Sequence, residues 1–445
     1  MNKHKSSSST LAIGFMLFAL FFGAGNLIFP VLMGQLSGEQ VWSATMGFIV
    51  TGVGLPLLGV LAIGFSGQSD LYSLAKRVHP IFAVVFTTVL YLAIGPLFAI
   101  PRTGSVSYEI GVKPLLGNTD SALPLFIFTL IFFVVTCFFA LKPGKIVDVV
   151  GKVLTPILLI FIAILIGAAI INPLGDFSTP TEKYTDLAFF TGFQEGYLTM
   201  DALASFVFGI IVINAVRAGG ATTKSETLKS VLKAGLIAAG LLAAIYAGLA
   251  YLGATSVREL GLMDNGGAVL AAASTHLFGS YGGVVLGLTV IAACLTTSIG
   301  LVTACAAYFN KLMPRISYVQ FAIILSVFSA VFANVGLANL ISISVPVLYA
   351  IYPVAICLMF LTFFHKLFKG KPEVYIVSLV FTFAVSLFDG LNAANIKIQA
   401  VNDLLVFLPL SSVGLGWIFP AVIGAIIGIP LAFIKKSAVA VPNKG

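Results

Sequence analysis

Long apolar stretches recur along the whole chain, and each is able to cross a lipid bilayer as a helix. A spanning helix needs about 20 predominantly apolar residues, whereas a transmembrane strand alternates over about 10. The stretches lie at 10–34, 41–65, 80–105, 122–141, 147–171, 197–217, 228–253, 281–310, 318–335, 339–364, 373–389 and 407–434. Of the 445 residues, 59% are hydrophobic and 9% charged, so a soluble fold would expose one large apolar surface. The sequence predicts an all-α integral membrane protein with 12 transmembrane helices.

The basic residues of the connecting segments predict how the chain is oriented. With Lys3 and Lys5 in the cytoplasm, 19 of the 24 Lys and Arg residues fall in cytoplasmic segments or just inside the adjoining helices. The remaining basic residues are Arg102, Lys113, Lys183, Arg258 and Lys397. Because Lys and Arg concentrate in cytoplasmic loops, we expect both termini in the cytoplasm. This placement accounts for the net charge of +8 without a nucleic-acid partner.

The stretch FFGAGNLIFP at 21–30 interrupts the first span in its middle. Glycine costs about 1 kcal/mol in a helix interior and proline about 3, and in lipid every freed backbone group needs another partner. An unwound segment leaves amide groups near Ala24, which suit a carboxylate, and carbonyl groups near Phe22, which suit a small cation. The alternative is a packing kink, in which small residues let helices cross closely.

A second interruption is predicted near residue 206, in the sixth span 197-YLTMDALASFVFGIIVINAVR-217. Both interrupted helices open a block of five spans, which is the pattern of an inverted repeat whose binding site lies where the breaks meet. Asp201 is the one carboxylate firmly inside a span. It serves either as an acid that complements an outward-facing helix N-terminus or in a proton or substrate role.

Two further spans carry polar residues of interest. In 293-ACLTTSIG-300, the hydroxyls of Thr296 and Thr297 and the carbonyl of Ala293 offer oxygen ligands for an alkali cation. Alternatively, both hydroxyls bond to their own helix. In 95-GPLFAIPRTGS-105, two prolines predict a distorted helix, and Arg102 is expected to anchor it at the outer interface or on a loop acid.

Other classes of protein find less support in the sequence. There is no Ser-His-Asp arrangement, phosphate loop or HExxH motif, and the four cysteines and four histidines lack metal-ligand spacing, so we expect no enzyme. A passive channel needs a continuous polar pore, yet the spans offer few polar residues outside the proposed centre.

Three segments, FFGAGNLIFP, GPLFAIPRTGSVSYE and GYLTMDALASFVFG, resemble those of the bacterial branched-chain amino acid:cation symporters. Length, span number and motif order also match. That family belongs to the amino acid–polyamine–organocation superfamily, so the resemblance implies the leucine-transporter fold. It implies a first inverted repeat at 1–175, a second at 176–365, and two additional helices with the C-terminal tail at 366–445.

The resemblance also implies a substrate site at the breaks. The carboxylate would bind the amides of Ala24 and Gly25, the amine would meet carbonyls between Ala202 and Ser205, and Phe208 would wall the aliphatic side chain. The implied substrate-binding set is Ala24, Gly25, Asn26, Ala202, Ser205 and Phe208. The sixth span has Gly209 alone where the sodium-coupled neurotransmitter-type branch has two glycines.

The implied metal site binds Na⁺ through backbone and hydroxyl oxygens. Its members are the carbonyls of Ala19, Phe22 and Ala293 and the hydroxyls of Thr296 and Thr297. The expected function is uptake of leucine, isoleucine and valine across the bacterial cell membrane by Na⁺ symport and alternating access. Coupling to H⁺ instead of Na⁺ is the alternative, and the sequence leaves the oligomeric state open.

Overall fold

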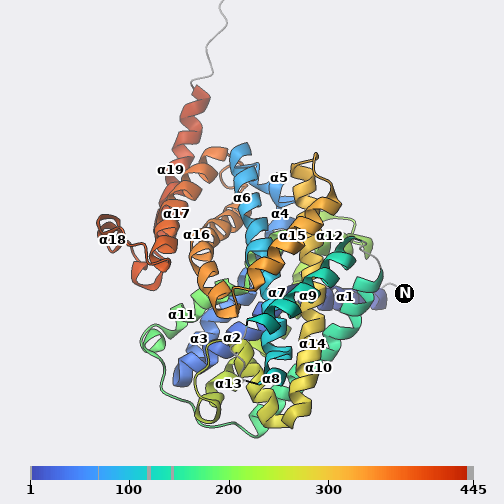
Figure 1. Cartoon of the computed structure of the whole chain (residues 1–445). Coiled ribbons are helices and arrows are strands. Elements are labelled where there is room, and N and C mark those ends of the chain that lie inside the picture. Colours follow the sequence, from blue (N-terminus) through green and yellow to red (C-terminus); the bar gives the residue numbers. More distant parts are fainter. Residues whose placement is uncertain (1–2, 69, 118–121, 142–144, 438–445) are drawn as a thin grey trace, which may run out of the picture.

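The computed structural model describes residues 3–68, 70–117, 122–141 and 145–437, and every regular element in these ranges is a helix (Figure 1). Eight helical segments there are long and apolar enough to span a membrane, and four shorter apolar helices accompany them. Large apolar side chains such as Phe138 and Ile171 are exposed on the outer surface, where only lipid would cover them. An all-helical membrane protein is thereby confirmed.

The helices follow one another without an intervening sheet. In order they are α1 (Lys3–Phe21), α2 (Ala24–Ser37), η1 (Gly38–Gln40), α3 (Val41–Ile49), η2 (Val50–Gly54), α4 (Leu55–Ser66), α5 (Leu71–Ala75), α6 (Pro80–Leu92), η3 (Ala93–Leu97), α7 (Ala99–Gly111), α8 (Lys113–Leu116), α9 (Leu123–Leu141), α10 (Lys145–Ile171), η4 (Glu182–Tyr184), α11 (Ala188–Glu195), η5 (Gly196–Thr199), α12 (Asp201–Ala218), α13 (Lys224–Leu260), α14 (Gly266–Leu312), α15 (Tyr318–Ala333), α16 (Leu337–Phe363), α17 (Pro372–Ala393), α18 (Gln399–Leu405), η6 (Ser411–Val413) and α19 (Ile418–Ser437).

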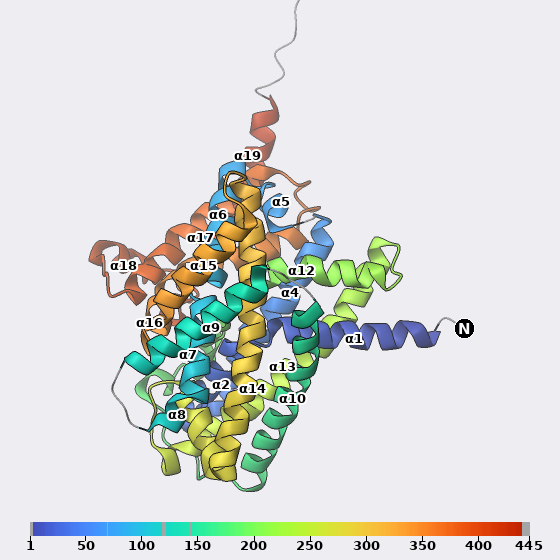
Figure 2. The ribbon, with the colours of Figure 1, turned by 45° about the vertical axis from the view of Figure 1, so that its right-hand side comes forward.

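The first predicted span is broken where the glycines occur. The last hydrogen bond of α1 runs from the Phe22 amide to the Phe18 carbonyl at 2.8 Å. Gly23 is extended, with φ −123° and ψ −166°, and α2 starts at Ala24. Figure 2 shows α1 running sideways from this point to the edge of the molecule. The predicted interruption is confirmed and lies at Phe22 and Gly23.

The second break lies about six residues before its predicted position. The sixth span begins with α11 at Ala188, continues through η5, and is interrupted at Met200, whose φ of 64° is left-handed. Residues 201–218 then form one continuous helix. The prediction of a break near residue 206 is wrong because a methionine, rather than the glycine at 209, adopts the left-handed conformation. No local sequence rule anticipates that choice, since left-handed backbone favours glycine.

Two other boundaries depend on backbone distortions. The predicted distortion of the third span is confirmed at Gly95, with φ −102° and ψ −125°, after which α7 restarts the helix at Ala99. In α14, Gly279 is non-helical, with φ 66° and ψ −168°, and it separates residues 266–278 from a second helical part whose start agrees with the predicted eighth span. The last helix starts at Ile418 and not at 407.

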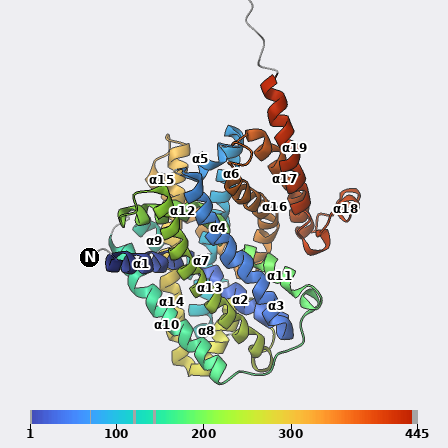
Figure 3. The same cartoon turned by 180° about the vertical axis from the view of Figure 1, so that it is seen from behind.

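Glycines bring α2 and α13 into close contact, and the two helices lie side by side (Figure 3). A Cβ added at Gly34 would lie 2.0 Å from the Ala250 carbonyl oxygen, and one added at Gly253 would lie 1.9 Å from that of Val31. At Gly23 the nearest contact would be an ordinary 3.6 Å, to Thr297. Close helix packing therefore explains Gly34 and Gly253 but not the glycine at the break.

The orientation of the chain and its division at 175 and 365 stay predictions. Lys142 and Lys444, two of the basic residues assigned to the cytoplasmic side, lie outside the described residues.

Two glycines of α13 provide a test of this packing. Gly253→Ala is expected to destabilise the protein by about 1–3 kcal/mol, because the new methyl group collides with the backbone of α2. Gly240→Ala, in the same helix with nothing within 4 Å, is expected to be neutral or slightly stabilising. Thermal unfolding midpoints of the purified proteins measure both effects, and equal midpoints would contradict the packing.

Candidate functional site

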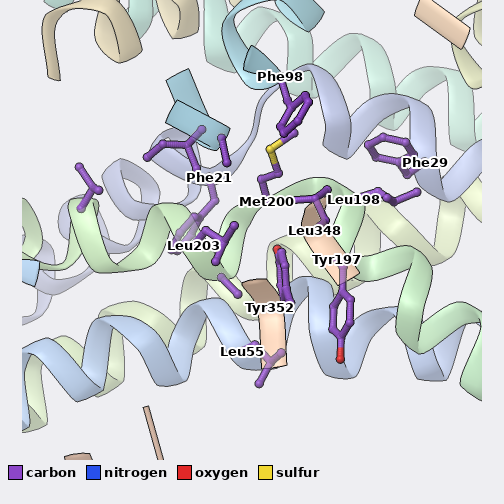
Figure 4. Packing of buried hydrophobic residues seen from close by; sticks show 14 of the residues in the cluster. Phe21, Phe29, Leu55, Phe98, Tyr197, Leu198, Met200, Leu203, Leu348 and Tyr352 are labelled. Atoms are coloured by element: carbon purple, nitrogen blue, oxygen red, sulfur yellow. The ribbon is translucent and has the colours of Figure 1, made fainter. Parts of the chain in front are cut away.

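The two helix breaks meet at a small cavity of about 50 Å³. Its wall is formed by the end of α1, the start of α2, α7, residues 199–201, the following turns of α12, and α14. Figure 4 shows Phe98 next to Met200, and Phe29 beside Leu198, in the packing around the second break. Substrate pockets usually measure about 300–1,000 Å³. The cavity is therefore smaller than a substrate pocket and holds only a few water molecules.

At the first break, α2 presents its N-terminus to the cavity. The amides of Ala24 and Gly25 belong to the first helical turn, which has no intrahelical acceptors. The Gly23 amide donates to Asn26 Oδ1 at 3.0 Å. A Cβ at Gly25 would lie 3.1 Å from Arg102 Nη1 and 3.2 Å from the Phe29 ring, so only glycine fits there without displacement.

A buried hydrogen-bond network joins the first break to the second. Asn26 Nδ2 donates to Asp201 Oδ2 and to the Tyr246 hydroxyl, and that hydroxyl donates to the same Asp201 oxygen at 3.3 Å. All three side chains are buried. Asp201 begins α12, and its own amide donates to Thr199 Oγ1 at 3.3 Å. The expected position of Asp201 at a helix N-terminus is confirmed, since it lies in the first turn of α12, but that turn is inside the protein because α11 and η5 precede it.

Arg102 reaches the same cavity from α7 and is only 2% exposed. Its Nη1 donates to the Leu198 carbonyl at 2.6 Å, and its guanidinium carbon lies 4.9 Å from the centre of the Phe29 ring. Its Nε and Nη2 have no hydrogen-bond partner. The expectation that Arg102 anchors the helix at an interface is wrong, because the distortion at Gly95 restarts the helix with Arg102 in a first turn beside the cavity.

The predicted substrate-binding residues fall into two groups. Ala24, Gly25, Asn26 and Phe208 line the cavity. Ser205 instead packs against α4, since a Cβ at Gly59 would lie 1.8 Å from its hydroxyl oxygen.

The predicted position of Ala202 and Ser205 in an unwound segment is wrong, because both lie within α12. The Ser205 hydroxyl donates to the Ala202 carbonyl at 2.6 Å, so that carbonyl already has a partner.

The predicted sodium ligands lie near the first break but are only partly brought together. Thr297 lines the cavity, and its methyl group faces Gly23. The hydroxyls of Thr296 and Thr297 both donate to the Ala293 carbonyl, at 2.8 and 3.1 Å. Ala19 is exposed and Phe22 is buried, and neither lines the cavity. Binding of Na⁺ by this set stays a prediction.

Arg102 and Tyr246 are the site residues that sequence reasoning missed. A signal was present for Arg102, because an ionisable residue within an apolar span is a functional candidate by default. For Tyr246, in the stretch AAIYAGLAYLG, nothing local distinguishes it from the neighbouring Tyr251.

Comparison of the structure with solved structures identifies the fold. The inward-facing conformation of Mhp1 gives a TM-score of 0.64 at 13% identity, over 96% of this chain and 91% of that chain. MhsT in complex with L-phenylalanine gives 0.53 at 18% identity, over 95% and 98%. The chain therefore has the fold of Mhp1 and MhsT.

The sequence comparisons identify the family. Residues 6–435 match the model of the branched-chain amino acid transport protein family. The chain is 57% identical over 436 residues to the branched-chain amino acid permease BrnQ of Bacillus subtilis (strain 168), covering 98% of this chain and 99% of that one. It is 43% identical to the branched-chain amino acid transport system 2 carrier protein of Pseudomonas aeruginosa, covering 96% of each. This chain belongs to the branched-chain amino acid transport protein family, and the relatives above are named as a permease and a carrier protein, so the chain is a transport protein and not an enzyme.

The network between the breaks predicts a specific loss of stability. Asn26→Ala removes the cap of Gly23 and a donor to buried Asp201, which is expected to cost about 1–3 kcal/mol. Asn339→Ala, which removes one exposed bond to the Val335 carbonyl just before α16, is the matched control. We expect a clearly lower thermal midpoint for Asn26→Ala alone. A midpoint equal to that of the control would contradict the network.

Proposed function

We propose that this protein takes up leucine, isoleucine and valine into the bacterial cell by symport with Na⁺. The observation that carries the proposal is a small cavity between two helix breaks, lined by the start of α2, Arg102 and Asp201, in a chain that belongs to a branched-chain amino acid transport family. Helix N-termini favour carboxylates, and carbonyl groups at a helix end favour cations. The start of α2, with its amide groups, and the end of α1, with its carbonyl groups, both lie at this cavity.

The proposed architecture is 12 spans arranged as a five-plus-five inverted repeat with two additional helices. The four shorter apolar helices and the eight long segments support this count, since Thr10–Phe21 and Ala24–Ser66 together contain the first two spans. The breaks in the first and sixth spans support the repeat, because they open the halves 1–175 and 176–365 at corresponding places. Both termini are proposed to face the cytoplasm.

Transport is proposed to proceed by alternating access, with spans 1, 2, 6 and 7 rocking against spans 3, 4, 8 and 9. The cavity of about 50 Å³ supports such motion, because a branched-chain amino acid enters only when the walls separate. The substrate carries no net charge as a zwitterion. The membrane potential therefore acts on the cation, at about 2.3 kcal/mol per charge per 100 mV.

Coupling to H⁺ is the second candidate, because Asp201 is a buried carboxylate at the cavity wall. Sodium coupling is supported by Thr297 lying against the break and by the motif resemblance. In this structure the hydroxyls of Thr296 and Thr297 donate to the Ala293 carbonyl. Binding of Na⁺ by these three oxygens therefore requires the two hydroxyls to turn toward the end of α1.

Replacement of Na⁺ by choline at fixed pH tests the proposed function in proteoliposomes that contain the purified protein. We expect saturable uptake of radiolabelled leucine with Na⁺, loss of most of it with choline, and recovery of unmodified leucine from the vesicles. Unchanged uptake in choline would overturn Na⁺ coupling in favour of H⁺. Absence of branched-chain amino acid uptake under both conditions would overturn the proposed substrate class.

Two threonines of α14 separate cation binding from helix stability. Thr297→Ala is expected to raise the Na⁺ concentration for half-maximal uptake about tenfold or more, because a polar contact to a charged group is worth about 1.5–3 kcal/mol and every 1.4 kcal/mol is tenfold. Thr289→Ala, whose hydroxyl bonds within the same helix to Val285 and Leu286 carbonyls, is expected to leave it unchanged. Identical Na⁺ dependence in both variants would contradict the assignment of Thr297.

A further inference from the structure

Two buried side chains of opposite charge line the cavity without pairing. Arg102 lies on α7 and Asp201 starts α12, and they are 2% and 4% exposed. The ion pairs among the described residues join other partners, and none joins these two. Each group lies within electrostatic range of the other, but they form no direct ion pair, and two nitrogens of Arg102 have no hydrogen-bond partner. Because a buried charge is unfavourable by several kcal/mol in general unless it is directly paired and hydrogen-bonded, this arrangement points to a ligand that contacts both side chains.

Arg102 forms the anion-binding end of this cavity. Its Nη1 is occupied by the Leu198 carbonyl, whereas its Nε and Nη2 are buried and have no partner. Those two groups form one edge of the planar guanidinium, and that edge matches the two oxygens of a carboxylate. Gly25 lies directly beside Arg102, so the free amides at the start of α2 act on the same anion.

Asp201 forms the cation-binding end. Two neutral donors, Asn26 Nδ2 and the Tyr246 hydroxyl, orient its Oδ2 but bring no positive charge. An ammonium group would supply that charge as well as further hydrogen bonds. The apolar part of the wall includes Phe21 and Phe208, whose rings meet edge to face at 6.0 Å, and it suits an aliphatic side chain.

We propose that Arg102 binds the α-carboxylate of the substrate through Nε and Nη2 and that Asp201 binds its α-ammonium group. This assignment rests on the proposed function, since it requires that an amino acid is transported. A zwitterion supplies one partner to each buried charge, whereas an aliphatic amine or a fatty acid supplies a partner to only one and leaves the other unpaired.

Competition against radiolabelled leucine, with analogues that each lack one charged group, tests the assignment. The analogues are 3-methylbutylamine, which lacks the carboxylate, and 4-methylpentanoate, which lacks the amine. In the wild-type protein each should compete about 30-fold or more weakly than leucine, as expected when a buried charge is left unpaired.

Three variants assign each end of the cavity. In Arg102→Gln, the ratio by which leucine competes more strongly than 3-methylbutylamine should fall toward one. In Asp201→Asn, the ratio by which leucine competes more strongly than 4-methylpentanoate should fall toward one. Arg102→Lys should retain part of its preference, because a lysine makes one point contact in place of two parallel bonds. Arg258→Gln, at an exposed ion pair with Asp176, and Asp389→Asn, at a different cavity, are matched controls that should keep both preferences.

The outcomes separate this assignment from the proposed function. If wild-type protein takes up leucine but Arg102→Gln keeps the wild-type preference over 3-methylbutylamine, Arg102 only positions Leu198 and the assignment is overturned. If wild-type protein takes up no branched-chain amino acid, the proposed function itself fails.

Thermal stabilisation of the wild-type protein gives an answer even where a variant does not fold. Leucine should raise the unfolding midpoint, and at the same concentration the two analogues should not. If 3-methylbutylamine stabilises the protein as much as leucine does, the assignment of the carboxylate to Arg102 is overturned. If 4-methylpentanoate does so, the assignment of the ammonium group to Asp201 is overturned.

Discussion

The need to satisfy backbone hydrogen bonds away from water constrains this structure more than any other interaction. In lipid, an interrupted helix is tolerated only where protein or enclosed water covers the freed groups. The breaks at Gly23 and Met200 meet this condition by facing each other across one cavity. Asn26 connects them, because its carbonyl oxygen caps the Gly23 amide while its amide group donates to Asp201. Each break therefore depends on the other for its stability.

The features predicted from the sequence are those whose cause is local. Glycines at 23 and 25 and the proline at 30 weaken the helix where they stand, so the first break and its free amides were predictable from FFGAGNLIFP. The distortion at Gly95 followed from Pro96 in the same way. Apolar length likewise predicted the membrane class, whereas the start of the sixth span at Ala188 was missed because residues 176–196 are too polar to register as a span.

The features that the sequence did not predict depend on contacts between distant segments. Met200 adopts a left-handed conformation that its residue type disfavours, and it does so where η5 and α12 meet inside the protein. Arg102 turns toward the cavity only because α7 restarts after Gly95, and its partners Leu198 and Phe29 come from two other elements. Local patterns hold no information about such partners, so Ala202 and Ser205 were predicted in an unwound segment that instead forms earlier, at Met200.

Because Arg102 and Asp201 form no direct ion pair, a substrate does not have to break one in order to bind. Had the two side chains formed a direct ion pair, the pair would satisfy both charges and a substrate would have to displace it. Instead, Arg102 is held by the Leu198 carbonyl and the face of Phe29, and Asp201 by Asn26 and Tyr246, which are all neutral groups. Neutral partners fix the position of each side chain without a direct ion pair between them. In the proposed assignment a zwitterion would pair directly with both side chains at once, and its binding would favour the state in which the walls close around it.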